Sequence, residues 1–130
     1  MLRLLDTDVM VDLFRRYPPA IRWMESQFST KDFALPGLVY LELIAGCRNK
    51  MEILDLHRRL RGYAIYWPNE DDMERSILDF SEIHLSHRLD IVDTLIAECA
   101  VGRGAILCTF NQKHFKAIPN LRTEQPYERK

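Results

Sequence analysis

The most constraining feature of this sequence is a set of short apolar runs that lack strict alternation and are separated by segments with helical spacing. The runs span residues 2–5, 33–35, 63–67 and 104–109. The helical segments span residues 9–14, 18–28, 36–45, 51–61, 73–83 and 90–102. Continuous apolar runs are typical of parallel strands covered on both faces, and strands that alternate with helices indicate βαβ crossovers. We therefore expect an α/β fold, a three-layer α/β/α domain with a short, mostly parallel central sheet.

Length and charge limit what this fold can do. The chain has 130 residues, below the ~150 typical of one domain, so we expect residues 1–130 to form a single unit. Eighteen Lys and Arg against 19 Asp and Glu give a formal net charge of −1. A molecule without net positive charge can hold nucleic acid only through a local basic patch.

The sequence also predicts where the protein works. Its longest uncharged runs, 33–41 and 104–112, are far shorter than the ~20 residues that span a bilayer, so no membrane partner is expected. The N-terminal apolar run is too short for a secretory signal, which predicts a cytoplasmic protein. Cys47, Cys99 and Cys108 lack CxxC spacing, so we expect reduced, mostly buried thiols and neither a disulfide framework nor a zinc site.

Asp6 comes directly after the first apolar run. Ligands of open parallel sheets bind at the carboxyl ends of the strands, so this position is a candidate for function. The alternative is a helix cap, because Asp6, Thr7 and Asp8 could satisfy the free amide groups of the following helix. The position alone leaves both interpretations open.

Glu42 is the one charged residue between Pro36 and Gly46. Leu41 and Leu43 flank it, so we expect its carboxylate to be partly buried. Burying an unpaired carboxylate is costly, so the group needs a cation, hydrogen-bond donors or a raised pKa. A structural ion pair and a role in metal binding both meet that need.

Asp90 and Asp93 lie three residues apart at the start of the helix expected over 90–102. Asp90 as N-cap with Asp93 in the first turn is similar to a capping arrangement. Asp93 also shares a helix face with Ile96 and Ala97, a face that we expect to meet packed structure. This second observation favours a functional role for Asp93.

Thr109 and Asn111 follow the run 104–109, which we expect to be the last strand. Asn111 could cap the short helix that ends at Phe115, or it could join a metal site. Three carboxylates and one carboxamide at one end of a sheet would form an all-oxygen site. Such a site suits Mg²⁺ or Mn²⁺ and is poor for Zn²⁺.

Other sites have little support from the sequence. No serine lies in a nucleophile elbow, and no glycine-rich phosphate loop is present. His84 and His87 have no Cys or third His nearby, so surface positions are expected for both. His57 and His114 have no partner motif either.

Four segments carry a family resemblance: Leu4-Leu5-Asp6-Thr7-Asp8-Val9, Tyr40-Leu41-Glu42-Leu43-Ile44-Ala45-Gly46, Asp93-Thr94-Leu95-Ile96-Ala97 and Cys108-Thr109-Phe110-Asn111-Gln112-Lys113-His114-Phe115. Together they resemble the PIN-domain ribonucleases, specifically the VapC-type toxins of type II toxin-antitoxin systems. The resemblance implies that Asp6, Glu42 and Asp93 are catalytic and hold the metal. The implied supporting residues are Asp8, Asp90, Thr109 and Asn111. Many relatives carry a fourth acid in the final motif, and this chain has none there.

The resemblance implies an endoribonuclease that depends on Mg²⁺ or Mn²⁺, forms a homodimer and is blocked by a VapB-like antitoxin. A bound divalent ion would lower the pKa of its water and offset charge on the phosphate oxygens. RNA must then reach an acidic site, which requires nearby cations. Those nearest the motif segments, each of which could equally be an ordinary solvated charge, are Arg15, Arg16, Arg48, Lys50 and Lys113.

Two alternatives stay open. The segment Asp6-Thr7-Asp8-Val9 also resembles the motif of haloacid-dehalogenase-like phosphatases, in which Asp6 would be a nucleophile. Met10 stands where that motif has Thr or Val, and no paired acidic motif follows a later strand. The other alternative is a non-catalytic partner-binding domain in which the acids are helix caps. Metal-dependent activity would distinguish an enzyme from such a binding domain.

Overall fold

The central element of the fold is a parallel sheet of five strands. The structure is a computed structural model that describes residues 1–27 and 32–129. Within these residues the strand order is β3-β2-β1-β4-β5, and every neighbouring pair is parallel. The strands are β1 (Arg3–Leu5), β2 (Phe33–Pro36), β3 (Ala64–Tyr66), β4 (Ile106–Cys108) and β5 (Arg122–Glu124). The expected parallel sheet is confirmed.

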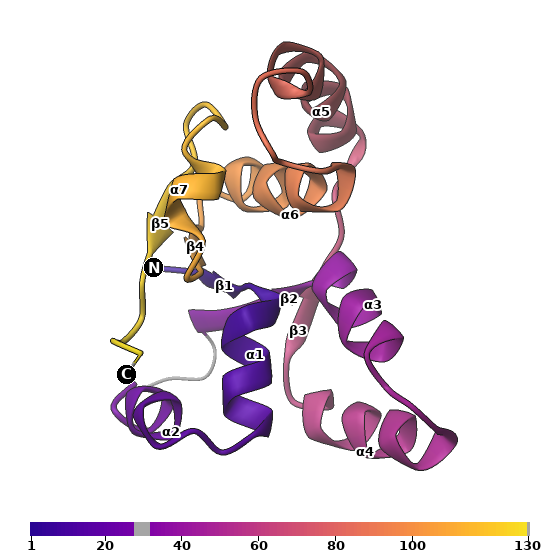
Figure 1. Cartoon of the computed structure of the whole chain (residues 1–130), viewed down its shortest axis with the longest axis vertical. Helices are drawn as coiled ribbons and strands as arrows, with labels where there is room; N and C mark the ends of the chain where they lie inside the picture. The colour runs from indigo at the N-terminus through magenta and orange to yellow at the C-terminus, as the bar shows by residue number, and fades with distance from the viewer. Residues whose placement is uncertain (28–31, 130) are drawn as a thin grey trace.

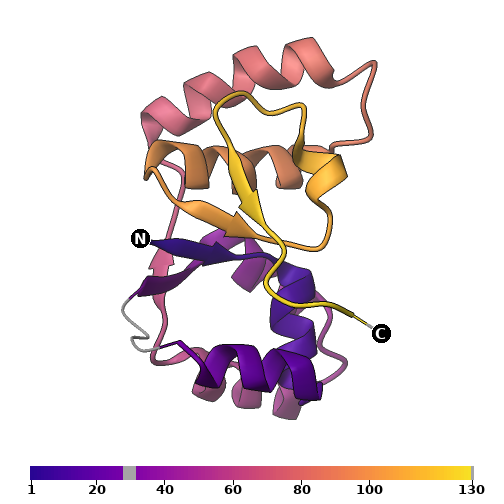
Figure 2. The same ribbon diagram turned by 90° about the vertical axis from the view of Figure 1, so that its left-hand side faces the viewer.

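Helices cover the sheet on both faces, which gives the expected three layers (Figure 1). One side carries α1 (Thr7–Phe14), α2 (Pro18–Glu25) and α4 (Lys50–Leu60), and α3 (Gly37–Ala45) lies beside β2 and contacts α1 and α6. The other side carries α5 (Glu70–Ile83), α6 (Ile91–Gly102) and the short α7 (Gln112–Phe115). Figure 2 shows α5 lying outside α6, which separates it from the sheet.

The core follows from the apolar strands at the centre of the sheet. Leu4 and Leu5 of β1 are fully buried, as are Leu35 of β2 and Leu107 of β4. Ile96 of α6 is also fully buried. Each such side chain contributes about 1.5–3 kcal/mol by leaving water, so the strand-forming runs are also the main source of stability. This explains why the sequence pattern predicts the central strands well.

Some boundaries differ from the prediction. The run 104–109 is not the last strand, because Arg122-Thr123-Glu124 pairs with β4 as β5. This polar edge strand has no apolar pattern by which it could be predicted. Pro36 pairs with Tyr66 and belongs to β2, so the next helix starts at Gly37. The helix expected over 18–28 ends at Glu25, and residue 28 lies outside the described residues.

Buried charges join α5 to α6. Glu98 of α6 and Asp72 of α5 are both almost fully buried. Arg75 donates to Asp72 Oδ1 at 2.7 Å and to Glu98 Oε1 at 3.2 Å, so one guanidinium serves both carboxyl groups. Burial raises the pKa of Glu98 to about 7. Asp72 also completes a capping box with Asn69 at the start of α5. Arg75 therefore connects the two helices through both carboxyl groups.

The three cysteines agree with the prediction of free, mostly buried thiols. Cys99 and Cys108 are buried, Cys47 is half-buried, and all three are free thiols. Among the described helices, none is long and apolar enough to cross a bilayer.

Candidate active site at the carboxyl ends of the strands

The candidate site lies where the order of the strands reverses. The chain passes from β1 outward to β2 and β3, and then returns to the other side of β1 to form β4 and β5. The crevice at the carboxyl ends of β1 and β4 is therefore the switch point of the sheet, where ligands of open α/β folds bind. Asp6 follows β1 and Thr109 follows β4, so the topology brings these residues together.

Asp6 is held by two hydrogen bonds in a nearly closed environment. Its side chain is the N-cap of α1, and Oδ1 accepts from the Thr7 amide at 2.8 Å. Oδ2 accepts from the Thr109 hydroxyl at 2.7 Å. Asp6 is only 5% exposed, and burial, followed by the charge of Asp8, raises its pKa to about 7. Asp6 can therefore cap α1 and belong to the candidate site at the same time.

Asp8 fixes the loop that follows β4. Its Oδ2 accepts from the Phe110 amide at 3.0 Å and from the Asn111 side-chain amide at 3.5 Å. Burial raises the pKa of Asp8. Its Oδ1 is buried and has no hydrogen-bond partner among the described residues. A buried carboxylate oxygen without a donor is unfavourable, which favours a cation beside it.

Asp90 caps the start of α6, whereas Asp93 lies among the charged groups of the candidate site. Asp90 is the N-cap of α6, and its Oδ1 accepts from the Asp93 amide at 2.8 Å. The Asp93 side chain is 27% exposed, and its Oδ2 lies 3.7 Å from His114 Nε2. Burial, followed by the charge of Asp90, raises the pKa of Asp93 to about 6. Asp93 also raises the pKa of Asp6, so the two carboxyl groups interact.

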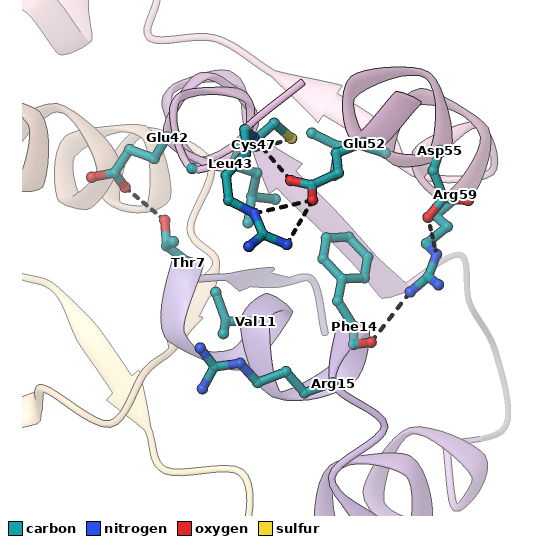
Figure 3. A pocket seen from close by; sticks show the side chains of 13 residues that line it. Thr7, Val11, Phe14, Arg15, Glu42, Leu43, Cys47, Glu52, Asp55 and Arg59 are labelled. Carbon is teal, nitrogen blue, oxygen red and sulfur yellow. Dashed lines mark hydrogen bonds and ion pairs between the residues drawn. The ribbon is translucent and has the colours of Figure 1, made fainter. Parts of the chain in front are cut away.

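The prediction that Glu42 is partly buried is wrong, because the residue is exposed. The end of α3 faces an open cavity, so apolar neighbours in sequence do not cover the carboxylate. Glu42 Oε1 accepts from the Thr7 hydroxyl at 2.6 Å, as Figure 3 shows. Its charge raises the pKa of Asp93. Glu42 therefore interacts with Asp93 and shares Thr7 as a hydrogen-bond donor with Asp6.

The cavity beside Glu42, here the first cavity, has a volume of about 690 Å³ and lies between α1, α3 and α4. Arg15 and Arg48 line it, and Arg48 is paired with Glu52 at 3.0 Å. Figure 3 shows the side chains of Thr7 and Glu42 at one end of this cavity. The remaining lining residues are Val11, Phe14, Leu43, Gly46, Cys47, Asp55, Leu56 and Arg59.

The acids do not form a closed metal cage. Among residues 1–27 and 32–129, no three Asp, Glu, His or Cys side chains converge closely enough to hold an ion. The three acids Asp6, Glu42 and Asp93 come from three elements, and Asp93 interacts with each of the other two.

The basic residues named from the sequence separate into two groups. Arg15 and Arg48 line the first cavity, whereas Lys50 and Lys113 do not. Lys50 is exposed at the start of α4, and Lys113 is exposed on α7. Arg16 follows α1 and lines a second cavity with Arg15.

Three residues at the site were not predicted to belong to it. Thr7 donates a hydrogen bond to Glu42, and its position next to Asp6 is the sequence feature that could have indicated this role. His114 lies beside Asp93, although it belongs to no motif of its own. Arg129 donates to the Asp8 carbonyl at 3.2 Å from the far end of the chain, and nothing in the sequence indicates this contact.

The fold agrees with the comparisons to known proteins. The PIN-domain family model matches residues 3–121. The chain belongs to the PIN-domain family. Over 130 residues this PIN domain is 32% identical to ribonuclease VapC19 of Mycobacterium tuberculosis (strain CDC 1551 / Oshkosh), across 97% of this chain and 100% of the relative. The predicted family and its VapC type are confirmed.

Solved structures show the same fold. A toxin-antitoxin complex from Klebsiella pneumoniae contains a chain with a TM-score of 0.77 and 25% identity, which covers 98% of this PIN domain and 99% of that chain. VapBC-1 from nontypeable Haemophilus influenzae contains one with a TM-score of 0.80 and 22% identity, which covers 97% and 98%. Because Asp6 belongs to a PIN domain, the dehalogenase-like interpretation of its motif is set aside.

Proposed function

We propose that this protein is an endoribonuclease toxin that hydrolyses RNA phosphodiester bonds with Mg²⁺ or Mn²⁺ and is neutralised by a cognate antitoxin. The observation that carries the proposal is the interaction of Asp6, Asp93 and Glu42 across three elements. The charge of Asp93 raises the pKa of Asp6 and that of Glu42 raises the pKa of Asp93, although the three side chains come from different elements. The similarity to ribonuclease VapC19 supports RNA as the substrate.

The residues at the site fit a hard divalent cation. Every side chain that we assign to the ion offers oxygen, which Mg²⁺ and Mn²⁺ prefer. The unpartnered Asp8 Oδ1 is a second observation in favour of positive charge at this edge. We assign the ion to Asp6, Glu42 and Asp93. When bound, it would supply an activated water and neutralise charge on the phosphate.

The chain itself positions these acids. Thr7 and Thr109 fix the two oxygens of Asp6, so this carboxylate cannot rotate freely. The Thr7 hydroxyl also orients Glu42, and Asp90 fixes the backbone of Asp93. Rigid support of this kind holds reacting groups in place before the substrate binds.

Cations near the site would attract the RNA strand. Arg15 and Arg48 line the cavity that Glu42 also lines. Arg16, Lys50 and Lys113 are exposed and offer further contacts to phosphate groups. Together these residues would offset the repulsion between the acidic site and RNA.

The partners follow from the same proposal. A VapB-like antitoxin would block the site, and the similarity to a solved toxin-antitoxin complex supports such a partner. The free toxin would form a homodimer. Light scattering of the purified protein should then give twice the 15.4 kDa mass of the chain.

The test of the proposal is cleavage of total RNA by purified, antitoxin-free protein. Discrete fragments should form with Mg²⁺ or Mn²⁺ and disappear when EDTA removes the metal, because an activated water is required. Sequencing the fragment ends would identify the target. Folded protein that cleaves no RNA and binds no Mn²⁺ would instead support a non-catalytic binding domain.

Glu42→Gln should weaken Mn²⁺ binding by about tenfold or more in isothermal titration calorimetry, because a neutral amide is a poorer ligand than a carboxylate. Glu52→Gln is the matched control, since Glu52 lines the same cavity but is paired with Arg48. The control should bind Mn²⁺ like the parent protein. Equal affinities for all three proteins would return Glu42 to a purely structural role.

A further inference from the structure

The C-terminal residues form a tail that packs against α1. Tyr127 and Arg129 lie beyond residues 3–121, the part matched by the family model. The Tyr127 hydroxyl donates to Asp12 Oδ2 at 2.8 Å, and Arg129 Nε donates to the same oxygen at 3.0 Å. Figure 2 shows the tail passing beside α1. The Tyr127 ring also contacts the rings of Tyr17, Trp23 and Phe110.

Arg129 is held in place by more than its ion pair. Its guanidinium lies 4.0 Å over the Phe110 ring, in addition to its bond to the Asp8 carbonyl. Phe110 belongs to the loop that Asp8 holds beside Asp6. The tail therefore presents a fixed positive charge at the margin of the candidate active site.

A second cavity opens at this place, with a volume of about 340 Å³. Its lining residues are Asp12, Arg15, Arg16, Tyr17, Pro18 and Arg129. Asp12 is its one acid and already accepts from Tyr127 and Arg129. Arg15 and Arg16 are exposed and form no ion pair with any residue that the structure describes. The second cavity therefore has an excess of positive charge.

The second cavity is next to the first, because Arg15 lines both. Figure 3 shows the Arg15 side chain beside Val11 on α1, with Thr7 further along the same helix and Glu42 of α3 facing Thr7. The 8 residues of α1 separate the two ends by about 12 Å at ~1.5 Å per residue. This separation is short enough for one RNA strand to span with a few nucleotides.

We propose that Arg15, Arg16 and Arg129 bind backbone phosphates of the RNA strand, one phosphate contact each, a few nucleotides from the bond that is cleaved. This inference rests on the proposed ribonuclease function. Guanidinium groups match phosphate oxygens with paired, charge-assisted hydrogen bonds. The second cavity lies one helix length from the carboxylates, so a strand that enters the site can fill both. The arginines of the second cavity attract the RNA phosphates, which the carboxylates of the site repel.

The test measures RNA binding and not cleavage, in protein that carries Asp93→Asn. A fluorescent single-stranded RNA of about 12 nucleotides matches the size of a typical single-strand site. Its affinity is measured by anisotropy between about 50 and 200 mM salt. Each lost phosphate contact lowers the slope of log affinity against log salt by about 0.7. Because no cleavage is read, failure of the proposed activity would not disturb this measurement.

The variant Arg15→Gln/Arg16→Gln/Arg129→Gln should lower the slope by about 2 and the affinity at low salt by about tenfold or more. Arg15→Gln/Arg16→Gln should lower the slope by about 1.4. The matched control, Arg103→Gln/Arg122→Gln, removes the same charge from side chains that line neither cavity and should keep the parent slope. Tyr127→Phe loosens the tail but keeps Arg129, so its slope should also stay unchanged.

Two results would overturn the proposal. One is a triple variant that folds, as circular dichroism shows, and keeps the parent slope or changes no more than the control. The other is a poly-glutamate peptide that binds the parent and not the triple variant while RNA binding is equal. That outcome would assign the second cavity to an acidic protein segment.

Discussion

Replacing Asp93 by asparagine is expected to lower RNA cleavage by a factor on the order of 10³ without unfolding the protein. Asparagine keeps the shape of the side chain and the Asp93 amide bond to Asp90. It removes the charge that would bind the metal. The measurement is the rate of fragment formation from total RNA in Mg²⁺, with circular dichroism to check the fold.

Asp71→Asn is the control for this loss. Asp71 is an exposed acid in the first turn of α5 and lies outside the candidate site. The control should cleave RNA at the parent rate. If Asp93→Asn also cleaved at the parent rate with unchanged metal dependence, the assignment of the site would be wrong.

Asp6→Asn should lose activity in the same way but gain stability. Burial and Asp8 raise the pKa of Asp6 from its ordinary 3.8 to about 7, so the folded protein disfavours the ionised form. Below pH 3.8 the neutral form of Asp6 contributes its full stabilisation to the folded protein. This contribution is lost as pH rises through about 7. Urea unfolding in EDTA at pH 8 should show a gain of about 2 kcal/mol in the variant. A large loss would mean that the hydrogen bonds of Asp6 outweigh its charge.

Gly102→Ala is expected to destabilise the protein by about 3 kcal/mol. A Cβ at Gly102 would overlap with Asp72 Oδ1. That oxygen cannot move freely, because Arg75 binds it at 2.7 Å and the second oxygen of Asp72 accepts from the Asn69 amide at 2.9 Å. The clash should force α5 away from α6. Urea or thermal unfolding measures the loss.

Gly62→Ala provides the comparison on the same scale. A Cβ at Gly62 has no heavy atom within 4 Å, so alanine should leave stability within about 1 kcal/mol of the parent or raise it slightly. Equal stability of the two variants would show that the contact between α5 and α6 accommodates one methyl group with little loss of stability.

The central strands could be predicted because their information is local. Leu4 and Leu5 are buried from both faces, so they must be apolar whatever their partners are. The same reasoning does not apply to β5, where the polar residues Arg122, Thr123 and Glu124 pair with β4 through their backbone. Backbone hydrogen bonds place few demands on side chains at a sheet edge.

The candidate acids were predictable from their places after strands and at helix starts, together with the family resemblance. Their surroundings were not. Glu42 was expected to be partly buried, yet α3 leaves it exposed beside the first cavity. Burial depends on which elements meet across a face, and neighbours in sequence do not decide that.

The sequence by itself determined the parallel α/β fold, the family and the acids Asp6, Glu42 and Asp93 as candidates, because periodicity and motifs are local properties. Only the tertiary structure decided that Thr109 binds Asp6 across 103 positions of the chain. It alone placed His114 beside Asp93 and brought Arg129 to the loop that Asp8 holds. Such contacts arise from the packing of segments distant in sequence, and a pattern along the chain carries no information about the distance between them.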